Sequence, residues 1–143
     1  MILDGINKQQ KKSLRIINFK GPQEPSEPLF VSNKTLKIKD HVSFLNLMFV
    51  FDFIHENLPE NFDSFFTLAN QVHCHATRAA NKSSLFVSHR RTAIYGSNSI
   101  LNKSIQQWNS LIQSTGIQPL EMNRSQFKLY VTDRLMTNYA TTS

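Results

Sequence analysis

The chain has 143 residues, of which 40% are hydrophobic and 18% charged, enough to bury the core of one domain. Eleven Phe and only four Gly exclude a disordered or low-complexity chain, and a lone cysteine, Cys74, excludes a disulfide scaffold and favours a reducing compartment. Sixteen basic and ten acidic residues give a net charge of +6, which excludes an acidic tail.

The charges are segregated along the chain. Residues 1–39 carry a net charge of +5, residues 40–77 contain no Lys or Arg and carry −5, and residues 78–143 carry +6. This pattern is typical of an internally complementary fold or of basic surfaces that meet a polyanion. Ordinary solvated faces would also produce it, so charge alone leaves the three interpretations open.

The first predicted element is an amphipathic helix over residues 6–19. Its apolar stripe consists of Ile6, Gln10, Leu14 and Ile17. Four cations lie on nearly the opposite side, namely Lys8, Lys11, Lys12 and Arg15. Gly21 and Pro22 end the helix, and Pro25 and Pro28 predict an extended linker over residues 23–30.

An apolar helix is predicted next. Residues 35–39 form a short strand or a lead-in to the helix, and include part of a second basic group, Lys34, Lys37 and Lys39. Asp40 is the expected N-cap of a helix over about 41–57, which ends before Pro59. Ten of the thirteen residues 42–54 are apolar, too few for a membrane span and typical of a buried helix. A second short helix that packs on this one is expected around residues 62–68, from the spacing of Phe62, Phe65, Phe66 and Leu68.

The last third of the chain predicts a small hairpin and two helices. Residues 84–96 have the short β-like runs of a hairpin that ends at Gly96. From about residue 99 a helix follows, with an apolar face of Leu101, Ile105, Trp108 and Ile112, and Gly116 and Pro119 end it. The last helix opens with Asn123 as N-cap and Gln126 as its partner, and buries Phe127, Val131, Leu135 and Tyr139.

The predicted fold is therefore mainly α, a single domain of about five helices with one small β-hairpin. Its expected parts are a basic N-terminal helix over residues 1–20, a proline-containing linker over 21–34, and a helical region with the hairpin over 35–143. We assign Trp108, Phe127 and the aromatic residues between positions 44 and 53 to the core rather than to base stacking.

Two groups of residues could carry chemistry, and each has a simpler explanation. His73 and His75 flank Cys74, but a structural zinc site needs two more ligands, so a loop with incidental histidines is preferred. Asp52, His55 and Glu56 are neighbours on one helix, and exposed polar residues explain them better than acid–base catalysis. We therefore expect no catalytic residue, no metal site and no cofactor.

An ordered series of short phrases points to a family. The chain resembles the C-terminal segment of reverse transcriptases from non-LTR retrotransposons of the jockey-like group, over roughly residues 6–139. The matching phrases are Leu14–Phe19, Pro25–Phe30, Leu36–Ile38, Asn57–Pro59 with Phe62 and Phe66, His75–Arg78, Arg91-Thr92, Tyr95–Ile100, Trp108–Leu111 and Phe127-Lys128.

The resemblance implies a tail that follows the palm and the start of the thumb of an RNA-directed DNA polymerase. The family's Tyr/Phe-Ala-Asp-Asp motif does not occur in this sequence, so no catalytic residue is carried over. The expected role is accessory, either contact with nucleic acid or packing on the thumb of the upstream polymerase, as a truncated copy or terminal fragment. The residues expected to contact phosphates are Lys8, Lys11, Lys12, Arg15, Arg78, Arg90 and Arg91.

The expected partners are RNA, DNA or an RNA–DNA hybrid, together with the upstream polymerase portion, and not a membrane. The expected location is intracellular, in the nucleus or the cytoplasm. The alternative function is a helical protein-interaction module, supported by the apolar richness of residues 42–66. A third hypothesis, a hydrolase that depends on His75, has the least support.

Overall fold

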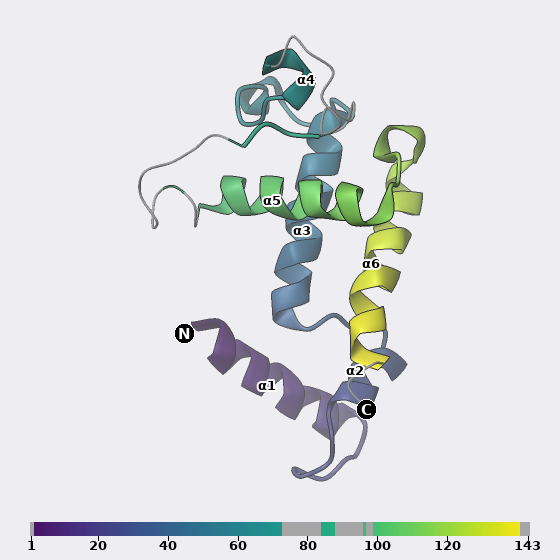
Figure 1. Ribbon diagram of the computed structural model, residues 1–143. Coiled ribbons are helices and arrows are strands. Elements are labelled where there is room, and N and C mark those ends of the chain that lie inside the picture. The colour runs from purple at the N-terminus through teal and green to yellow at the C-terminus, as the bar shows by residue number, and fades with distance from the viewer. Residues whose placement is uncertain (1, 73–83, 88–95, 97–98, 141–143) are drawn as a thin grey trace. The chain divides into compact units, whose positions relative to one another are not determined.

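The computed structural model describes residues 2–72, 84–87, 96 and 99–140, and these residues are mainly helical, as the sequence predicts (Figure 1). Among them are six α-helices, four of seven residues or more. The α-helices are α1 (Ile2–Ile17), α2 (Glu27–Ser32), α3 (Ile38–Ile54), α4 (Ala69–Val72), α5 (Ile100–Thr115) and α6 (Arg124–Ala140), with 3₁₀ turns η1 (Glu60–Phe62) and η3 (Pro119–Glu121). None of the described helices has both the length and the hydropathy needed to cross a bilayer.

The chain clusters into two compact units. Unit 1 comprises Met1–Phe44 and Leu129–Ser143, and unit 2 comprises Leu45–Lys128. Segments from the beginning and the end of the sequence thus belong to the same unit. The predicted division after residues 20 and 34 stays a prediction.

The core of unit 1 joins α1, α2 and α6. Phe30 of α2 is fully buried, and its ring meets the ring of Tyr139 edge to face, with 6.1 Å between the centroids. Leu14 of α1 and Leu29 of α2 complete this cluster, and Leu36 and Met136 pack against it. Because α2 supplies two of the buried side chains, this short helix holds the unit together.

The helix α2 corrects the predicted linker over residues 23–30. Pro28 lies in the first turn of α2, where a helix has no partner for the missing N–H, so the proline is compatible with a helix there. Ser26 stands at the N-cap position and is buried, and Glu27 places a carboxylate in the first turn. A proline at this position starts a helix instead of preventing one.

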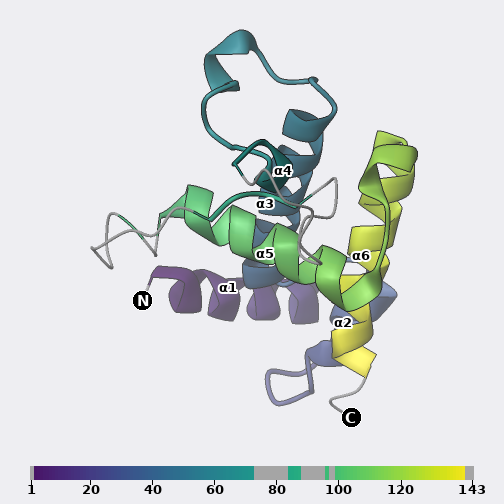
Figure 2. The same cartoon turned by 45° about the horizontal axis from the view of Figure 1, so that its top comes forward.

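The core of unit 2 is aromatic. Phe127 of α6 is fully buried between Phe51 of α3, at 4.5 Å between ring centroids, and Trp108 of α5, at 5.6 Å. Figures 1 and 2 both show α5 running across α3, and Asn46 of α3 donates a hydrogen bond to Gln107 of α5 at 3.1 Å. The assignment of Trp108, Phe127, Phe44 and Phe51 to the core is confirmed, whereas Phe49 and Phe53 are half-buried.

Three of the predicted helix ends are confirmed in atomic detail. The Ser99 hydroxyl caps α5 by accepting from the Asn102 amide at 3.3 Å, and Gly116 ends that helix in the left-handed conformation, with φ +65°. At the start of α6, the Asn123 side chain accepts from the Gln126 N–H at 2.8 Å, and the Gln126 side chain accepts from the Asn123 N–H at 3.0 Å. This reciprocal pair is a capping box.

Several predicted helix boundaries are wrong, and α1 spans Ile2–Ile17 instead of residues 6–19. The helix α3 begins at Ile38, two residues before Asp40, so Asp40 lies in the first turn and is not the N-cap. The expected helix over residues 62–68 is replaced by the 3₁₀ turn η1 and the later short helix α4. Phe62 and Phe66 nevertheless pack against Phe49 of α3, at 5.6 and 5.7 Å between ring centroids, so the predicted packing of this segment on α3 is present.

The predicted hairpin over residues 84–96 is absent from the residues that the structure describes. Leu85 forms an isolated antiparallel bridge with Leu68, and the Asn109 side chain of α5 binds both the N–H and the carbonyl of Leu85, at 2.9 and 2.8 Å. A side-chain amide thus satisfies the polar groups that a second strand would have bound. The expected second arm, residues 92–95, lies outside the described residues.

Candidate nucleic-acid interface

The predicted cationic stripe of α1 divides into two pairs. Lys11 forms an ion pair with Glu27, at 3.3 Å between Nζ and Oε1, and the Arg15 Nε donates to the Glu24 carbonyl at 2.8 Å. Both partners belong to the segment that was predicted to be a linker. Lys11 and Arg15 are therefore held by contacts within the chain, and only part of the stripe remains for a ligand.

Lys8 and Lys12 form the other pair. Both side chains are exposed, and neither makes an ion pair with any residue that the structure describes. They lie four residues apart on α1, so their side chains leave the same face of the helix one turn from each other. We call Lys8 and Lys12 the free lysine pair.

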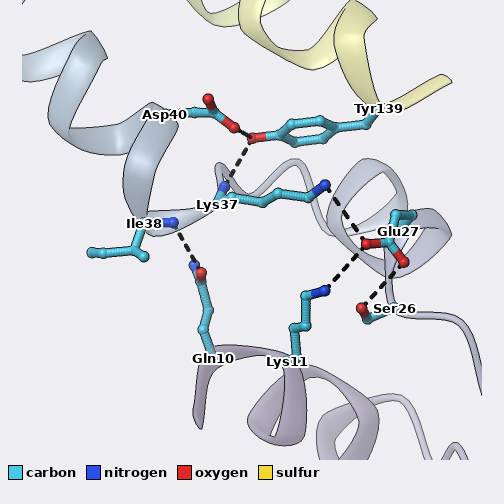
Figure 3. A network of polar contacts seen from close by, with 8 residues as sticks. All are labelled: Gln10, Lys11, Ser26, Glu27, Lys37, Ile38, Asp40 and Tyr139. Atoms are coloured by element: carbon cyan, nitrogen blue, oxygen red, sulfur yellow. Dashed lines mark hydrogen bonds and ion pairs between the residues drawn. The ribbon is translucent and has the colours of Figure 1, made fainter. Parts of the chain in front are cut away.

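Glu27 is the centre of a polar network in unit 1 (Figure 3). Its carboxylate accepts from Lys11 at 3.3 Å, lies 3.7 Å from the Lys37 ammonium and accepts from the Ser26 hydroxyl at 3.4 Å. Partial burial raises the pKa of Glu27, but the hydrogen bond from its own N–H and the two lysines outweigh burial, so its pKa is lowered. Glu27 is thus an anion that neutralises Lys11, one of the predicted phosphate-binding cations, and Lys37 of the second basic group.

The same network ties α3 to α1 and α6. The Gln10 side chain accepts from the Ile38 N–H at 3.0 Å (Figure 3), and it donates to the Leu36 carbonyl at 2.8 Å. The Tyr139 hydroxyl accepts from the Lys37 N–H at 2.9 Å and donates to Asp40. Gln10, which the sequence places in an apolar stripe, therefore satisfies backbone groups at the start of α3.

The apolar stripe of α1 is only partly buried. Leu14 is 7% exposed, but Ile6 is 44% exposed and Ile17 is 66% exposed. Ile16 and Phe19 add further exposed apolar surface at the end of the helix, at 64% and 97%. The buried face of α1 is therefore narrower than expected, because the side chains of only a single turn pack into the core of unit 1.

The other predicted cations are paired or lie outside the described residues, except Lys34, which is exposed and forms no ion pair with a described residue. Lys37 lies near Glu27 and over the Tyr139 ring, 4.5 Å from its centroid, and Lys39 pairs with Asp4 at 3.2 Å. The three remaining residues expected to contact phosphates lie outside the described residues: Arg78, Arg90 and Arg91.

No hydrogen bond or ion pair joins the side chains of the acid–base candidates to one another. Asp52 binds Arg124 through two hydrogen bonds, at 2.8 and 3.1 Å, while the His55 ring stacks on Phe51 and bonds to the carbonyl of that residue at 3.0 Å. Glu56 lies beyond the end of α3 in the left-handed conformation, with φ +56°. His73, Cys74 and His75 lie outside the described residues, and the side chains that the structure describes form no group of three or more that could hold a metal ion.

The residues that bind two of these cations within the chain were not predicted from the sequence. Glu24 and Glu27 hold Arg15 and Lys11, and both were assigned to a linker without a role. The Ser26-Glu27-Pro28 triplet was the available signal, because a serine followed by an acid and a proline is typical of a helix start. Comparison of the chain with family models, with curated proteins and with solved structures finds no match.

Proposed function

We propose that this chain is a non-catalytic accessory domain that contacts nucleic-acid phosphates through α1. In this proposal it corresponds to the tail of a jockey-like reverse transcriptase, as its ordered sequence phrases indicate. The observation that carries the contact is the free lysine pair, Lys8 and Lys12, exposed on one face of α1. Unpaired ammonium groups bind phosphate without first giving up an internal partner.

The cations of the stripe that have partners within the chain should contribute less to phosphate binding than the free lysine pair. A phosphate would have to compete with the Glu27 carboxylate for Lys11 and with the Glu24 carbonyl for Arg15. Glu27 neutralises Lys11, so removing that ammonium changes the local potential less than removing a free one, whereas Arg15 keeps its charge and only its Nε–H is bound by the Glu24 carbonyl. The free lysine pair should therefore supply most of the phosphate affinity of α1.

The test measures binding of single-stranded RNA, duplex DNA and an RNA–DNA hybrid between 50 and 200 mM salt. Lys8→Gln/Lys12→Gln should reduce the slope of log affinity against log salt by about 1.4 for a single strand. The control, Lys34→Gln/Lys103→Gln, removes two exposed lysines elsewhere, and its slope should stay near that of the wild type. Equal slopes for the two variants would contradict the proposal.

A second candidate function is protein interaction, which the exposed end of α1 supports. Ile16, Ile17 and Phe19 together present three large apolar side chains, each more than half exposed. The sequence suggests such a patch within residues 42–66, where six large apolar side chains are buried, five are half-buried, and Val42, Leu45 and Phe65 are exposed but less so than Ile16, Ile17 and Phe19.

The dependence of binding affinity on salt concentration distinguishes the two functions. Phosphate contacts weaken steeply as salt rises, whereas apolar association does not. Ile16→Ser/Phe19→Ser should leave RNA affinity within about twofold if α1 binds through its lysines. If that variant abolishes a salt-insensitive association while Lys8→Gln/Lys12→Gln does not, protein interaction is the better assignment.

A further inference from the structure

Unit 2 contains a half-open pocket with a volume of about 400 Å³. It lies where the end of α3 meets the segment that includes η1 and leads to α4. Its apolar lining includes Phe53, Phe66 and Leu68, and its polar lining includes Glu56, Glu60 and Asp63. The volume is within the range of sites that bind small molecules or single side chains.

The floor of the pocket is fixed by ring packing. Phe66 is 5% exposed and meets Phe53 at 5.0 Å and Phe49 at 5.7 Å between ring centroids. The antiparallel bridge between Leu68 and Leu85 holds the next part of the lining. These contacts make the apolar floor part of the fold, so an occupant would not have to create it.

No cation in the part of the chain that the structure describes pairs with the acidic rim of the pocket. Glu56, Glu60 and Asp63 are exposed, and none of them forms an ion pair with a residue that the structure describes. Residues 40–77 contain no Lys or Arg, so no cation adjacent in the sequence neutralises them, and Arg124 is bound to Asp52 instead. The backbone supports this arrangement, because Glu56 occupies the left-handed position after α3, while Glu60 begins η1 and Asp63 follows it.

The charge and polarity of the lining residues indicate which kind of ligand the pocket can bind. The three carboxylates do not converge closely enough to form a metal site. An alkyl chain with a planar cation at its end suits the pocket better, because its stem can contact the apolar floor, its plane can stack on a phenylalanine ring, and its N–H groups can bind carboxylates. An arginine side chain has all three properties.

We propose that the pocket lined by Phe53, Phe66, Leu68, Glu56, Glu60 and Asp63 binds an arginine side chain of a basic peptide segment in a partner protein. Charge complementarity between the rim and the guanidinium defines this occupant, and the apolar floor receives its methylene stem. The site lies in unit 2 and does not depend on the lysines of α1, so it is independent of the proposed nucleic-acid contact.

The test uses a fluorescent, acetylated and amidated peptide of glycine, serine and two arginines, titrated with the full chain. In the control peptide citrulline replaces arginine, which removes the charge and keeps the shape. We expect the citrulline peptide to bind about fivefold more weakly, because an exposed ion pair contributes up to about 1 kcal/mol, which corresponds to about fivefold in affinity. Equal binding of the two peptides, or no binding of either, would overturn the proposal.

A matched pair of variants locates the site on the chain. Glu60→Gln/Asp63→Asn should weaken arginine-peptide binding about fivefold, whereas Glu121→Gln/Asp133→Asn removes the same charge from outside the pocket and should change it less than twofold. Equal weakening by both variants would mean attraction to net charge alone and would overturn the assignment. Circular dichroism of both variants checks that the helices are retained, and free arginine amide as competitor distinguishes side-chain binding from binding of the peptide backbone.

Discussion

The hydroxyl of Tyr139 donates a hydrogen bond to the Asp40 carboxylate at 2.5 Å, across 99 positions of sequence. The same hydroxyl accepts from the Lys37 N–H at 2.9 Å, so one side chain of α6 binds two groups at the start of α3 (Figure 3). Tyr139 is 4% exposed and also packs on Phe30. This residue therefore joins the last helix to the first 40 residues within unit 1.

Removing the Tyr139 hydroxyl should destabilise the fold. Tyr139→Phe keeps the ring but leaves the Lys37 N–H and the Asp40 carboxylate without their partner, and we expect a loss of about 1–3 kcal/mol in the free energy of unfolding. Urea unfolding followed by circular dichroism measures this loss. Tyr130→Phe on the same helix is the control, since no hydrogen bond of its hydroxyl joins a described residue. A Tyr139→Phe variant as stable as the control would contradict the role assigned to this network.

The stability of the chain should fall at alkaline pH through Tyr139. Burial, followed by the bond to Asp40, raises the pKa of Tyr139 well above its ordinary value of 10.0. The protonated hydroxyl therefore contributes stability that is present below about pH 10 and is lost as pH rises above it. The stability difference between wild type and Tyr139→Phe should narrow as pH rises from 9 to 11. A constant difference over that range would argue against the raised pKa.

At acidic pH the Glu27 network should weaken. The pKa of Glu27 in the fold lies below its ordinary value of 4.5, so its contribution is present above that pH and is lost as pH falls further. Glu27→Gln should therefore be less stable than wild type at pH 7, and the two should approach each other near pH 3. Thermal unfolding at these two pH values measures the convergence. Glu121→Gln, which removes an exposed acid from unit 2, serves as control.

Three helices are followed by a residue other than glycine in the left-handed backbone conformation, which is strained for such residues. Phe19, Lys34 and Glu56 adopt φ of +54°, +49° and +56°, and each occupies the left-handed position that usually holds glycine. In each case the two closing hydrogen bonds are present, for example Phe19 N to Ile16 O at 3.1 Å and Lys20 N to Arg15 O at 2.8 Å. These closing bonds hold residues that lack the conformational freedom of glycine.

Glycine at two of these positions should therefore stabilise the chain. We expect Phe19→Gly and Lys34→Gly each to raise the free energy of unfolding by about 0.5–1 kcal/mol, because the backbone strain that is relieved exceeds the entropy that glycine adds to the unfolded chain. Phe19 is 97% exposed, so no packing is lost. Gly116→Ala makes the opposite change at φ +65° and should cost about 1 kcal/mol. Denaturant midpoints of the three variants measure these effects, and lower midpoints for both glycine variants would refute the account.

The aromatic core of unit 2 should depend strongly on Phe127. Its side chain is fully buried between Phe51 and Trp108, so Phe127→Ala should cost about 3–5 kcal/mol. Leu129→Ala on the same helix is the control, because Leu129 is 64% exposed and its truncation should change stability by less than about 0.5 kcal/mol. Similar losses for the two variants would show that the buried rings do not dominate the core.

The sequence by itself determined the main helices and most of the core. Local signals sufficed for the start and end of α5 and for the capping box of α6, since these depend on residues three or four positions apart. Apolar spacing likewise placed Trp108 and Phe127 inside, because a helix with one apolar face has to bury it. The end of α1 is harder to predict from the sequence, because Phe19, and not a glycine, occupies the left-handed position after this helix.

Only the tertiary structure decided which charges remain available. Helical spacing puts Lys8, Lys11, Lys12 and Arg15 on one side of α1 but does not show that Glu24 and Glu27 meet two of them. The three carboxylates at the pocket rim are likewise spaced along a turn whose path depends on phenylalanine packing. The physical reason is that helix formation is governed by neighbouring residues, whereas the pairing of a charge depends on contacts between distant segments.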